Sequence, residues 1–265
     1  MWHLKDKHYF IFGISNKKSV AYVTAKTLET LGAQLSFSVQ NNTQLEFVKK
    51  EFPNSATFLL DVGRDESLND FKNLVSSMKP LDGMLHSIAF ANFQNPVPFH
   101  ETSWKNFSEA TRISAFSLVE LANILKPVLK PQSSVVTVSI SNTRATAYGY
   151  LGPVKAMLNS LVDFLAKSFS KEFNETQNGQ VRFNAVAAGP LKTSSSAGIP
   201  HYIENYLFAE ALTLRKKNLE TQEVANTIIF LLSPYSSGIN AQMITIDAGM
   251  GANYFDESVV NKFSK

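Results

Sequence analysis

A tyrosine and a lysine that could act together on a carbonyl oxygen stand seven residues apart, at Tyr148 and Lys155. A phenol hydroxyl donates a hydrogen bond, and a nearby ammonium group strengthens it as a donor. Such a donor stabilises negative charge that develops on an oxygen in a transition state. On these two residues alone, an ordinary surface tyrosine and an ordinary surface lysine near a helix are the favoured interpretation.

A second tyrosine, Tyr150, competes with Tyr148 for this role. It precedes Lys155 by five residues, which is about 500° of helical rotation, whereas the seven residues from Tyr148 give about 700°, nearly two full turns. Tyr148 would therefore share the helix face of the lysine. Gly152-Pro153 predicts that a helix starts nearby, which would put Tyr148 on the preceding loop, so helical rotation only supports the choice.

A possible phosphate-binding loop begins at Gly13, which ends a short apolar run over 9–12 and leads through Ala21 into a helical pattern. A loop at this place can aim backbone N–H groups and the positive end of a helix dipole at a pyrophosphate. The usual G-x-G-x-x-G fingerprint is absent, because only one of its glycines is present. An ordinary turn between a strand and a helix explains the segment equally well.

Short apolar runs alternate with helical patterns along the chain. The predicted strands are 9–12, 35–39, 56–60, 81–88, 134–140, 181–187 and 243–246, and the predicted helices include 19–31, 116–129, 156–173 and 221–232. This alternation is typical of a parallel sheet with helices on both faces. Most of the strands are continuously apolar, as in strands buried on both sides, but 35–39 alternates. We predict an α/β fold: a single domain over 1–265 with a Rossmann-type doubly wound parallel sheet of about seven strands.

The least regular segment runs from about 190 to 215 and is rich in serine and alanine before it becomes helical and aromatic. Ligands of doubly wound folds bind at the carboxyl ends of the strands. This segment follows the predicted strand 181–187, so we expect it to act as a substrate lid.

Composition excludes several classes of protein. Hydrophobic residues make up 44% of the 265 residues, too many for a disordered chain. The net charge of +3 includes no run of five like charges, so a nucleic-acid partner is not expected. The absence of cysteine excludes a disulfide scaffold and a cysteine nucleophile.

The remaining sequence features set expectations about location and metals. No apolar run is long enough to span a membrane, and the N-terminus does not resemble a signal peptide, so we expect a cytoplasmic protein without a membrane partner. The five histidines are scattered, and none pairs with another at metal-ligand spacing. No metal is therefore predicted.

Seven motifs in order along the chain point to one family. They are Gly13-x5-Ser19-Val20-Ala21-Tyr22, Val39-Gln40-Asn41, His86-Ser87-Ile88-Ala89-Phe90-Ala91, Ile113-Ser114-Ala115-Phe116-Ser117, Tyr148-x6-Lys155-Ala156, Ala188-Gly189-Pro190-Leu191-Lys192-Thr193 and Ile246-Asp247-Ala248-Gly249. Together they resemble the enoyl-acyl-carrier-protein reductases, divergent members of the short-chain dehydrogenase/reductase superfamily. The Tyr-x6-Lys spacing discriminates best, because ordinary superfamily members carry Tyr-x3-Lys. The tyrosine of that motif would stand four residues before Lys155, where this sequence has Leu151.

The resemblance implies NADH-dependent reduction of the carbon–carbon double bond of a trans-2-enoyl thioester in fatty acid biosynthesis. The thioester would be carried by acyl carrier protein or by CoA. Hydride adds to the carbon β to the carbonyl, and negative charge develops on the carbonyl oxygen as an enolate. By resemblance, Tyr148 would bind the substrate and donate to this oxygen, and Lys155 would also hold the nicotinamide ribose. Family members are mostly homotetramers, and long apolar helices after the fourth and fifth strands predict the same assembly here.

The resemblance also implies the rest of the site. Cofactor-binding residues would be Gly13, Ser19, Val20, Gln40, Asp61, Val62, Ile88, Lys155, Leu191, Lys192, Thr193, Ser194 and Ser195, with Ala91 and Tyr148 contacting the substrate. Asp61 is explained equally well as a polar residue that ends a strand. The end of the second strand, Gln40-Asn41-Asn42, offers no cation to balance a 2′-phosphate, so NADH is predicted in preference to NADPH.

Three departures from the family pattern keep alternatives open. Ile140 stands where the family often has a second tyrosine, and Ala89 stands where glycine is commonest. Pro200 and Glu204 stand where relatives carry basic residues that meet acyl carrier protein. One alternative is a superfamily reductase for a carbonyl or a specialised enoyl substrate. The other is a binding protein that keeps the fold and has lost turnover, against which the retained tyrosine–lysine pair argues.

Overall fold

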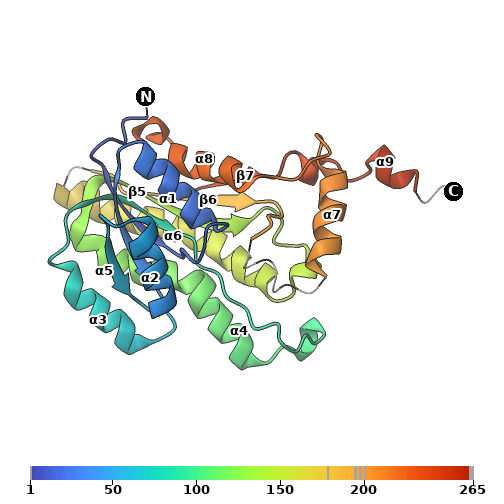
Figure 1. The fold of residues 1–265 in the computed structure, drawn as a ribbon, viewed down its shortest axis with the longest axis horizontal. Coiled ribbons are helices and arrows are strands. Elements are labelled where there is room, and N and C mark those ends of the chain that lie inside the picture. Colours follow the sequence, from blue (N-terminus) through green and yellow to red (C-terminus); the bar gives the residue numbers. More distant parts are fainter. Residues whose placement is uncertain (1, 178, 194–195, 197–198, 200, 263–265) are drawn as a thin grey trace.

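The computed structural model describes residues 2–177, 179–193, 196, 199 and 201–262. Its centre is one sheet of seven parallel strands in the order β3-β2-β1-β4-β5-β6-β7 (Figure 1). The strands are β1 (His8–Phe12), β2 (Gln34–Val39), β3 (Ala56–Leu59), β4 (Leu81–His86), β5 (Leu129–Ile140), β6 (Arg182–Ala188) and β7 (Gln242–Ile246). The strand order reverses between β1 and β4, where doubly wound sheets bind their ligands. The predicted fold class is confirmed.

Helices cover both faces of the sheet. They are α1 (Val20–Thr30), α2 (Asn42–Glu51), α3 (Asp65–Val75), α4 (Trp104–Thr111), α5 (Ser117–Leu125), α6 (Leu151–Gln177), α7 (Tyr202–Leu212), α8 (Thr221–Leu232) and α9 (Glu257–Val260). One hydrophobic cluster joins the sheet to α3, α4, α5 and α6, and a second joins it to α1, α2 and α8. Helix α7 stands at one end of the molecule, beyond the carboxyl ends of the strands (Figure 1). Among the described residues, no helix is long and apolar enough to cross a membrane.

The inner strands of the sheet are buried, whereas the edge strands β3 and β7 have no fully buried residue. All five residues of β1 are buried, because helices pack on both sides of it. In β2 the residues from Leu35 to Val39 are likewise all buried, although their pattern alternates. The alternating residues are small serines, and the Ser36 hydroxyl lies 2.9 Å from Nε2 of His8 inside the sheet. The alternation therefore does not mark an exposed face.

The main error in the predicted elements lies before β5. The predicted helix 116–129 is wrong at both ends: α5 ends at Leu125, and β5 begins at Leu129. A π-helical turn, Arg112–Phe116, joins α5 to the unpredicted helix α4. A short 3-10 turn that contains Pro127 separates α5 from the strand, because proline cannot continue the hydrogen bonding of a helix interior.

Helix α6 starts at Leu151, ahead of the helical pattern 156–173 and next to Gly152-Pro153, where the sequence predicted a helix start. Gly152 and Pro153 lie in its first turn, where a missing proline N–H costs nothing. A side chain at Gly152 would come within 2.7 Å of the Thr143 carbonyl oxygen. The glycine therefore lets the loop after β5 pass close to the start of α6, and this places the end of that loop next to the carboxyl edge of the sheet.

Candidate active site

Two hollows meet at the carboxyl edge of the sheet. The first lies over the ends of β4, β5 and β6 and contains Tyr148 and Lys155. The second lies over the ends of β1, β2 and β3 and contains Gln40 and Asp61. The residues that line both are Gly13, Ser87, Ile88, Ala89 and Phe90. The hollows therefore adjoin, which suits an elongated ligand with two ends.

Tyr148 ends a 3-10 turn that precedes α6 rather than lying within the helix. Gly149 follows it with a φ of 54°, a left-handed conformation that glycine adopts without strain. The tyrosine side chain is partly exposed and lines the first hollow. Burial, and secondarily the nearby Tyr202, raises the pKa of Tyr148 well above that of a free phenol. Its hydroxyl therefore keeps its proton and serves as a donor at neutral pH.

Lys155 approaches the first hollow from α6 and is only 5% exposed. Its ammonium donates to the carbonyl oxygens of Val138 at 2.9 Å and Ile88 at 3.4 Å. Val138 lies near the end of β5, and Ile88 follows β4. Burial lowers the pKa of Lys155 to about 8. An ammonium has three N–H donors, so the two carbonyls leave one donor for a ligand.

Tyr150 has a different environment from Tyr148. It is buried, and its hydroxyl donates to the Asn92 carbonyl oxygen at 2.9 Å. Its ring packs against the rings of Phe93 and Phe107. Tyr150 thus anchors the segment after β4 and is not among the residues that line the first hollow.

The Gly13 loop brings the amino end of α1 to the first hollow. Gly13 has a φ of 87°, and a side chain on it would clash with the carbonyl oxygen of Ser87. Ser19 caps α1 by accepting a hydrogen bond from the backbone N–H of Tyr22 at 3.2 Å, and Ser19 and Val20 line the hollow. A helix amino terminus in this position attracts an anionic group, which fits the diphosphate of a dinucleotide.

The second hollow contains the predicted adenosine-side residues Gln40, Asp61 and Val62. One Asp61 carboxylate oxygen accepts from the backbone N–H of Gly63 at 2.9 Å, which shapes the turn after β3. Arg64 also lines this hollow and was not predicted, because the expectation of no cation rested on the end of β2 alone. Its guanidinium lies 3.2 Å from the carboxylate of Glu66 on an exposed surface.

The loop after β6 contributes Leu191 and Thr193 to the first hollow. Lys192 does not line it; its ammonium lies 4.7 Å from the centre of the Tyr206 ring on α7. Its role in cofactor binding stays a prediction. Ser194 and Ser195 lie outside the described residues.

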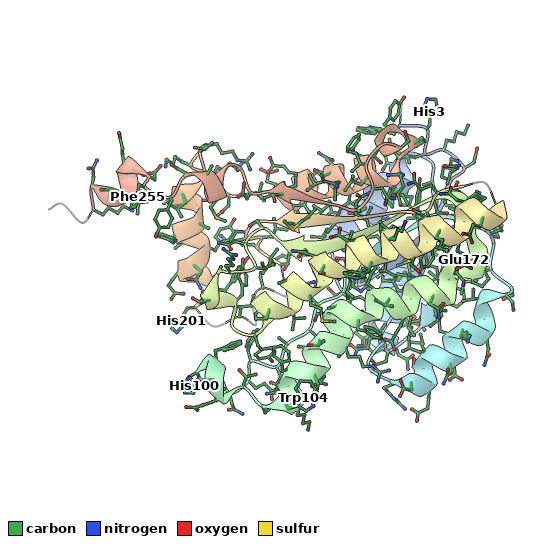
Figure 2. All side chains as sticks on the ribbon, turned by 180° about the vertical axis from the view of Figure 1, so that it is seen from behind. His3, His100, Trp104, Glu172, His201 and Phe255 are labelled. Carbon is green, nitrogen blue, oxygen red and sulfur yellow. The ribbon has the colours of Figure 1, made fainter. Side chains whose placement is uncertain are left out.

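The substrate side of the first hollow differs from the sequence expectation in one residue. Ala91 lines it as predicted, and so does Ile140, which offers no hydroxyl. Tyr202 lines the same hollow from the first residue of α7 and was not predicted. The only signal for it was an aromatic residue in the helical part of the segment 190–215. Figure 2 shows His201, just before α7, at the same end of the molecule as His100.

His86 lies beneath the site without reaching it. It is completely buried, with its ring nitrogens 2.8 Å from the Thr137 hydroxyl and 2.9 Å from the Ser117 hydroxyl. Burial, followed by the charge of Lys155, lowers the pKa of His86 to about 3, so the ring is neutral. Within the described ranges, no three histidine or acidic residues are grouped so that they could hold a metal.

Comparisons with known proteins agree on one family. The family model described as enoyl-(acyl carrier protein) reductase matches residues 13–251. An NADPH-dependent enoyl-acyl-carrier-protein reductase of Staphylococcus aureus (strain MRSA252) is 32% identical over 95% of this chain and 99% of its own. An NADH-dependent one of Buchnera aphidicola subsp. Schizaphis graminum is 31% identical over 94% and 96%. The crystal structure of the NADH enzyme of Aquifex aeolicus VF5 has a TM-score of 0.85 at 28% identity and covers 94% of this chain and 97% of its own.

Proposed function

The chain belongs to the enoyl-acyl-carrier-protein reductase family, and from this membership we propose that it reduces the double bond of a trans-2-enoyl thioester with NADH in fatty acid biosynthesis. The observation that carries the proposal is the pairing of Tyr148 and Lys155 on one hollow that adjoins the hollow of Gln40 and Asp61. NADH oxidation in the presence of crotonyl thioesters, on CoA and on acyl carrier protein, tests it. We place this reaction in the cytoplasm.

The site residues can supply what this reduction needs. A bound NADH supplies the hydride for the carbon β to the carbonyl, and a proton added to the α carbon completes the saturated thioester. Tyr148 donates a hydrogen bond to the carbonyl oxygen, where negative charge develops. Its raised pKa keeps the donor protonated. Lys155 uses its remaining N–H on the cofactor ribose and places a positive charge near the developing oxyanion.

We propose that the segment 190–215 is the substrate lid of a single reductase domain over 1–265. Ile199 and Tyr202 from this segment line the first hollow. All seven strands belong to one sheet. Glu204 is exposed on α7 and adds a negative charge to the surface on this side of the hollow, which does not favour an acidic carrier protein. Comparing KM for the same acyl group on CoA and on acyl carrier protein shows which carrier the enzyme recognises.

The pH dependence of turnover should follow the protonation state of Lys155. Its pKa of about 8 means that the ammonium loses its proton within the working range of an assay. We expect kcat/KM of the free enzyme to fall as pH rises through about 8. Tyr148 does not produce this fall, because its pKa is raised. A kcat/KM profile that stays flat up to pH 10 would contradict this role of Lys155.

The burial of Lys155 also sets how its contribution to the free energy of unfolding changes with pH. Its folded pKa lies below the unfolded value of about 10.4, so the unfolded chain binds more protons between these two values. The contribution of Lys155 to the free energy of unfolding is unfavourable below pH 8 and rises with pH through this window.

Cofactor preference should follow the end of β2. Gln40 is uncharged, and the one arginine described on the second hollow, Arg64, is already paired with Glu66. The relatives include both NADPH and NADH enzymes. We expect NADH to give the higher kcat/KM and Gln40→Arg to shift the preference toward NADPH, because a cation balances the 2′-phosphate. Tighter binding of NADPH than of NADH by the unmodified protein in a titration would overturn this assignment.

We propose a homotetramer built on the faces of α5 and α6. Phe164 on α6 is 73% exposed, and Phe116, just before α5, is also exposed, although both are large and apolar. Burying such side chains between subunits removes apolar surface from water. We expect Phe164→Asp to convert the tetramer into smaller species in multi-angle light scattering. A monomer in the unmodified protein at micromolar concentration would contradict the proposed assembly.

A further inference from the structure

Tyr202 joins two walls of the site. It is the first residue of α7 and is only 7% exposed, whereas the next residue, Ile203, is 59% exposed. Its side chain lines the first hollow together with that of Tyr148. Its hydroxyl donates to the carbonyl oxygen of Leu191 at 2.7 Å. One hydrogen bond therefore links the helix on the substrate side to the loop that follows β6.

The Leu191 carbonyl is a shared acceptor, and Tyr202 is well suited to hold it. Ser196 approaches the same oxygen at 2.8 Å, but its hydroxyl is also 2.8 Å from the Thr193 carbonyl oxygen. A serine hydroxyl carries one proton and can donate fully to only one of these acceptors. The bond from Tyr202 is therefore the one that ties Leu191 to α7 rather than to its own loop.

The second tyrosine of the first hollow comes from α7 and not from β5. Ile140 brings no hydroxyl to the first hollow, and Tyr148 and Tyr202 are the two tyrosines among its described lining residues. The two phenols are close enough that Tyr202 contributes to the raised pKa of Tyr148. A shift of α7 therefore changes the surroundings of Tyr148 as well as the position of Leu191.

We propose that Tyr202 is a positioning residue that couples binding of the acyl thioester to binding of the nicotinamide cofactor. This role rests on the proposed function, in which Leu191 belongs to the cofactor loop and the first hollow holds the acyl group. A cofactor that orders Leu191 fixes the acceptor of the Tyr202 hydroxyl and so orders the substrate wall. A thioester packed against Tyr202 orders Leu191 in return, because coupling between two binding sites is reciprocal.

The test measures this coupling and compares two tyrosines on one helix. NADH is titrated by its fluorescence with and without saturating butyryl-CoA, a saturated thioester that cannot be reduced. Tyr202→Phe removes only the hydroxyl. Tyr206→Phe makes the same change one turn further along α7, at a buried residue that does not line the hollow.

In the unmodified protein we expect butyryl-CoA to lower the Kd of NADH at least about fivefold. We call the ratio of the NADH Kd without butyryl-CoA to that with butyryl-CoA the coupling factor. In Tyr202→Phe the coupling factor should fall close to one, while the Kd of NADH alone changes less than about threefold. Tyr206→Phe should keep the factor of the unmodified protein. The proposal is overturned if butyryl-CoA leaves the NADH Kd of the unmodified protein unchanged, or if it lowers the NADH Kd of Tyr202→Phe as much as that of the unmodified protein.

Crotonyl-thioester turnover separates this proposal from the function on which it rests. If the unmodified protein turns over without coupling, only the role of Tyr202 is refuted. If it shows no turnover on CoA or carrier-protein thioesters, the proposed function fails, and the role of Tyr202 in it fails as well.

Discussion

Replacing Tyr148 with phenylalanine is expected to lower kcat by about 10²–10³-fold, the usual effect of removing one donor to a developing oxyanion. The affinity for NADH should barely change, because the ring remains and only the hydroxyl is lost. Ile140 has no hydroxyl and the Tyr202 hydroxyl is donated to the Leu191 carbonyl, so neither can take over, and the effect should lie toward the upper end of this range. Single-turnover kinetics together with an NADH titration measure the two quantities separately.

Tyr150→Phe is the matched control for this variant. Its hydroxyl bonds to the Asn92 carbonyl outside the first hollow, so its loss should reduce kcat by less than about tenfold. If Tyr150→Phe abolished turnover while Tyr148→Phe remained near full activity, the wrong tyrosine would have been assigned and the argument from Tyr-x6-Lys spacing would fail.

Replacing Lys155 with alanine is expected to damage both chemistry and cofactor binding. The variant loses the positive charge near the oxyanion and the N–H donor available to the ribose. We expect kcat to fall by about 10²-fold or more and the Kd of NADH to rise about ten- to a hundredfold. Steady-state kinetics and a fluorescence titration check the two effects.

Lys155→Ala also removes the donor to the Val138 and Ile88 carbonyls, which can weaken the fold. A control must therefore show that the variant is folded. Thermal unfolding of the free variant shows whether the fold survives. A folded Lys155→Ala variant that keeps the unmodified Kd for NADH would contradict the assignment of the lysine to the ribose.

The sequence predicted those parts of the structure that depend on burial and on a single spacing. The predicted strand 9–12 covers four of the five residues of β1, because four consecutive apolar residues mark a buried strand. Tyr148 and Lys155 were singled out by their spacing and assigned a role by the family resemblance, and the structure places both on the first hollow. A strand or a spaced pair is a local pattern, which one chain displays without reference to its other parts.

Contacts between distant segments could not be predicted in this way. The carbonyls of Val138 and Ile88 hold Lys155 from two different strand ends, and carbonyls leave no mark in a sequence. Arg64 reaches the second hollow only because β3 lies beside β2 in the sheet. Lys192 turns toward Tyr206 instead of the hollow, which depends on where α7 lies.

The boundary errors have a local cause. The apolar run across 116–129 fits a helix, and nothing in its pattern separates α5 from the first residue of β5. Leu129 is nevertheless paired with Leu81 in the sheet, and the irregular pairing that follows shows that tertiary contacts set the start of this strand.

The most direct test of the central claim follows the hydride itself. Crotonyl-CoA, or the same acyl group on acyl carrier protein, is incubated with NADH that carries deuterium in the transferred position, and the product is examined by NMR. The proposed function predicts a butyryl thioester with an intact carbonyl and deuterium on the carbon β to it. Deuterium on a carbinol carbon would identify a carbonyl reductase, and absence of transfer to any enoyl thioester would show that the chain does not perform this reduction.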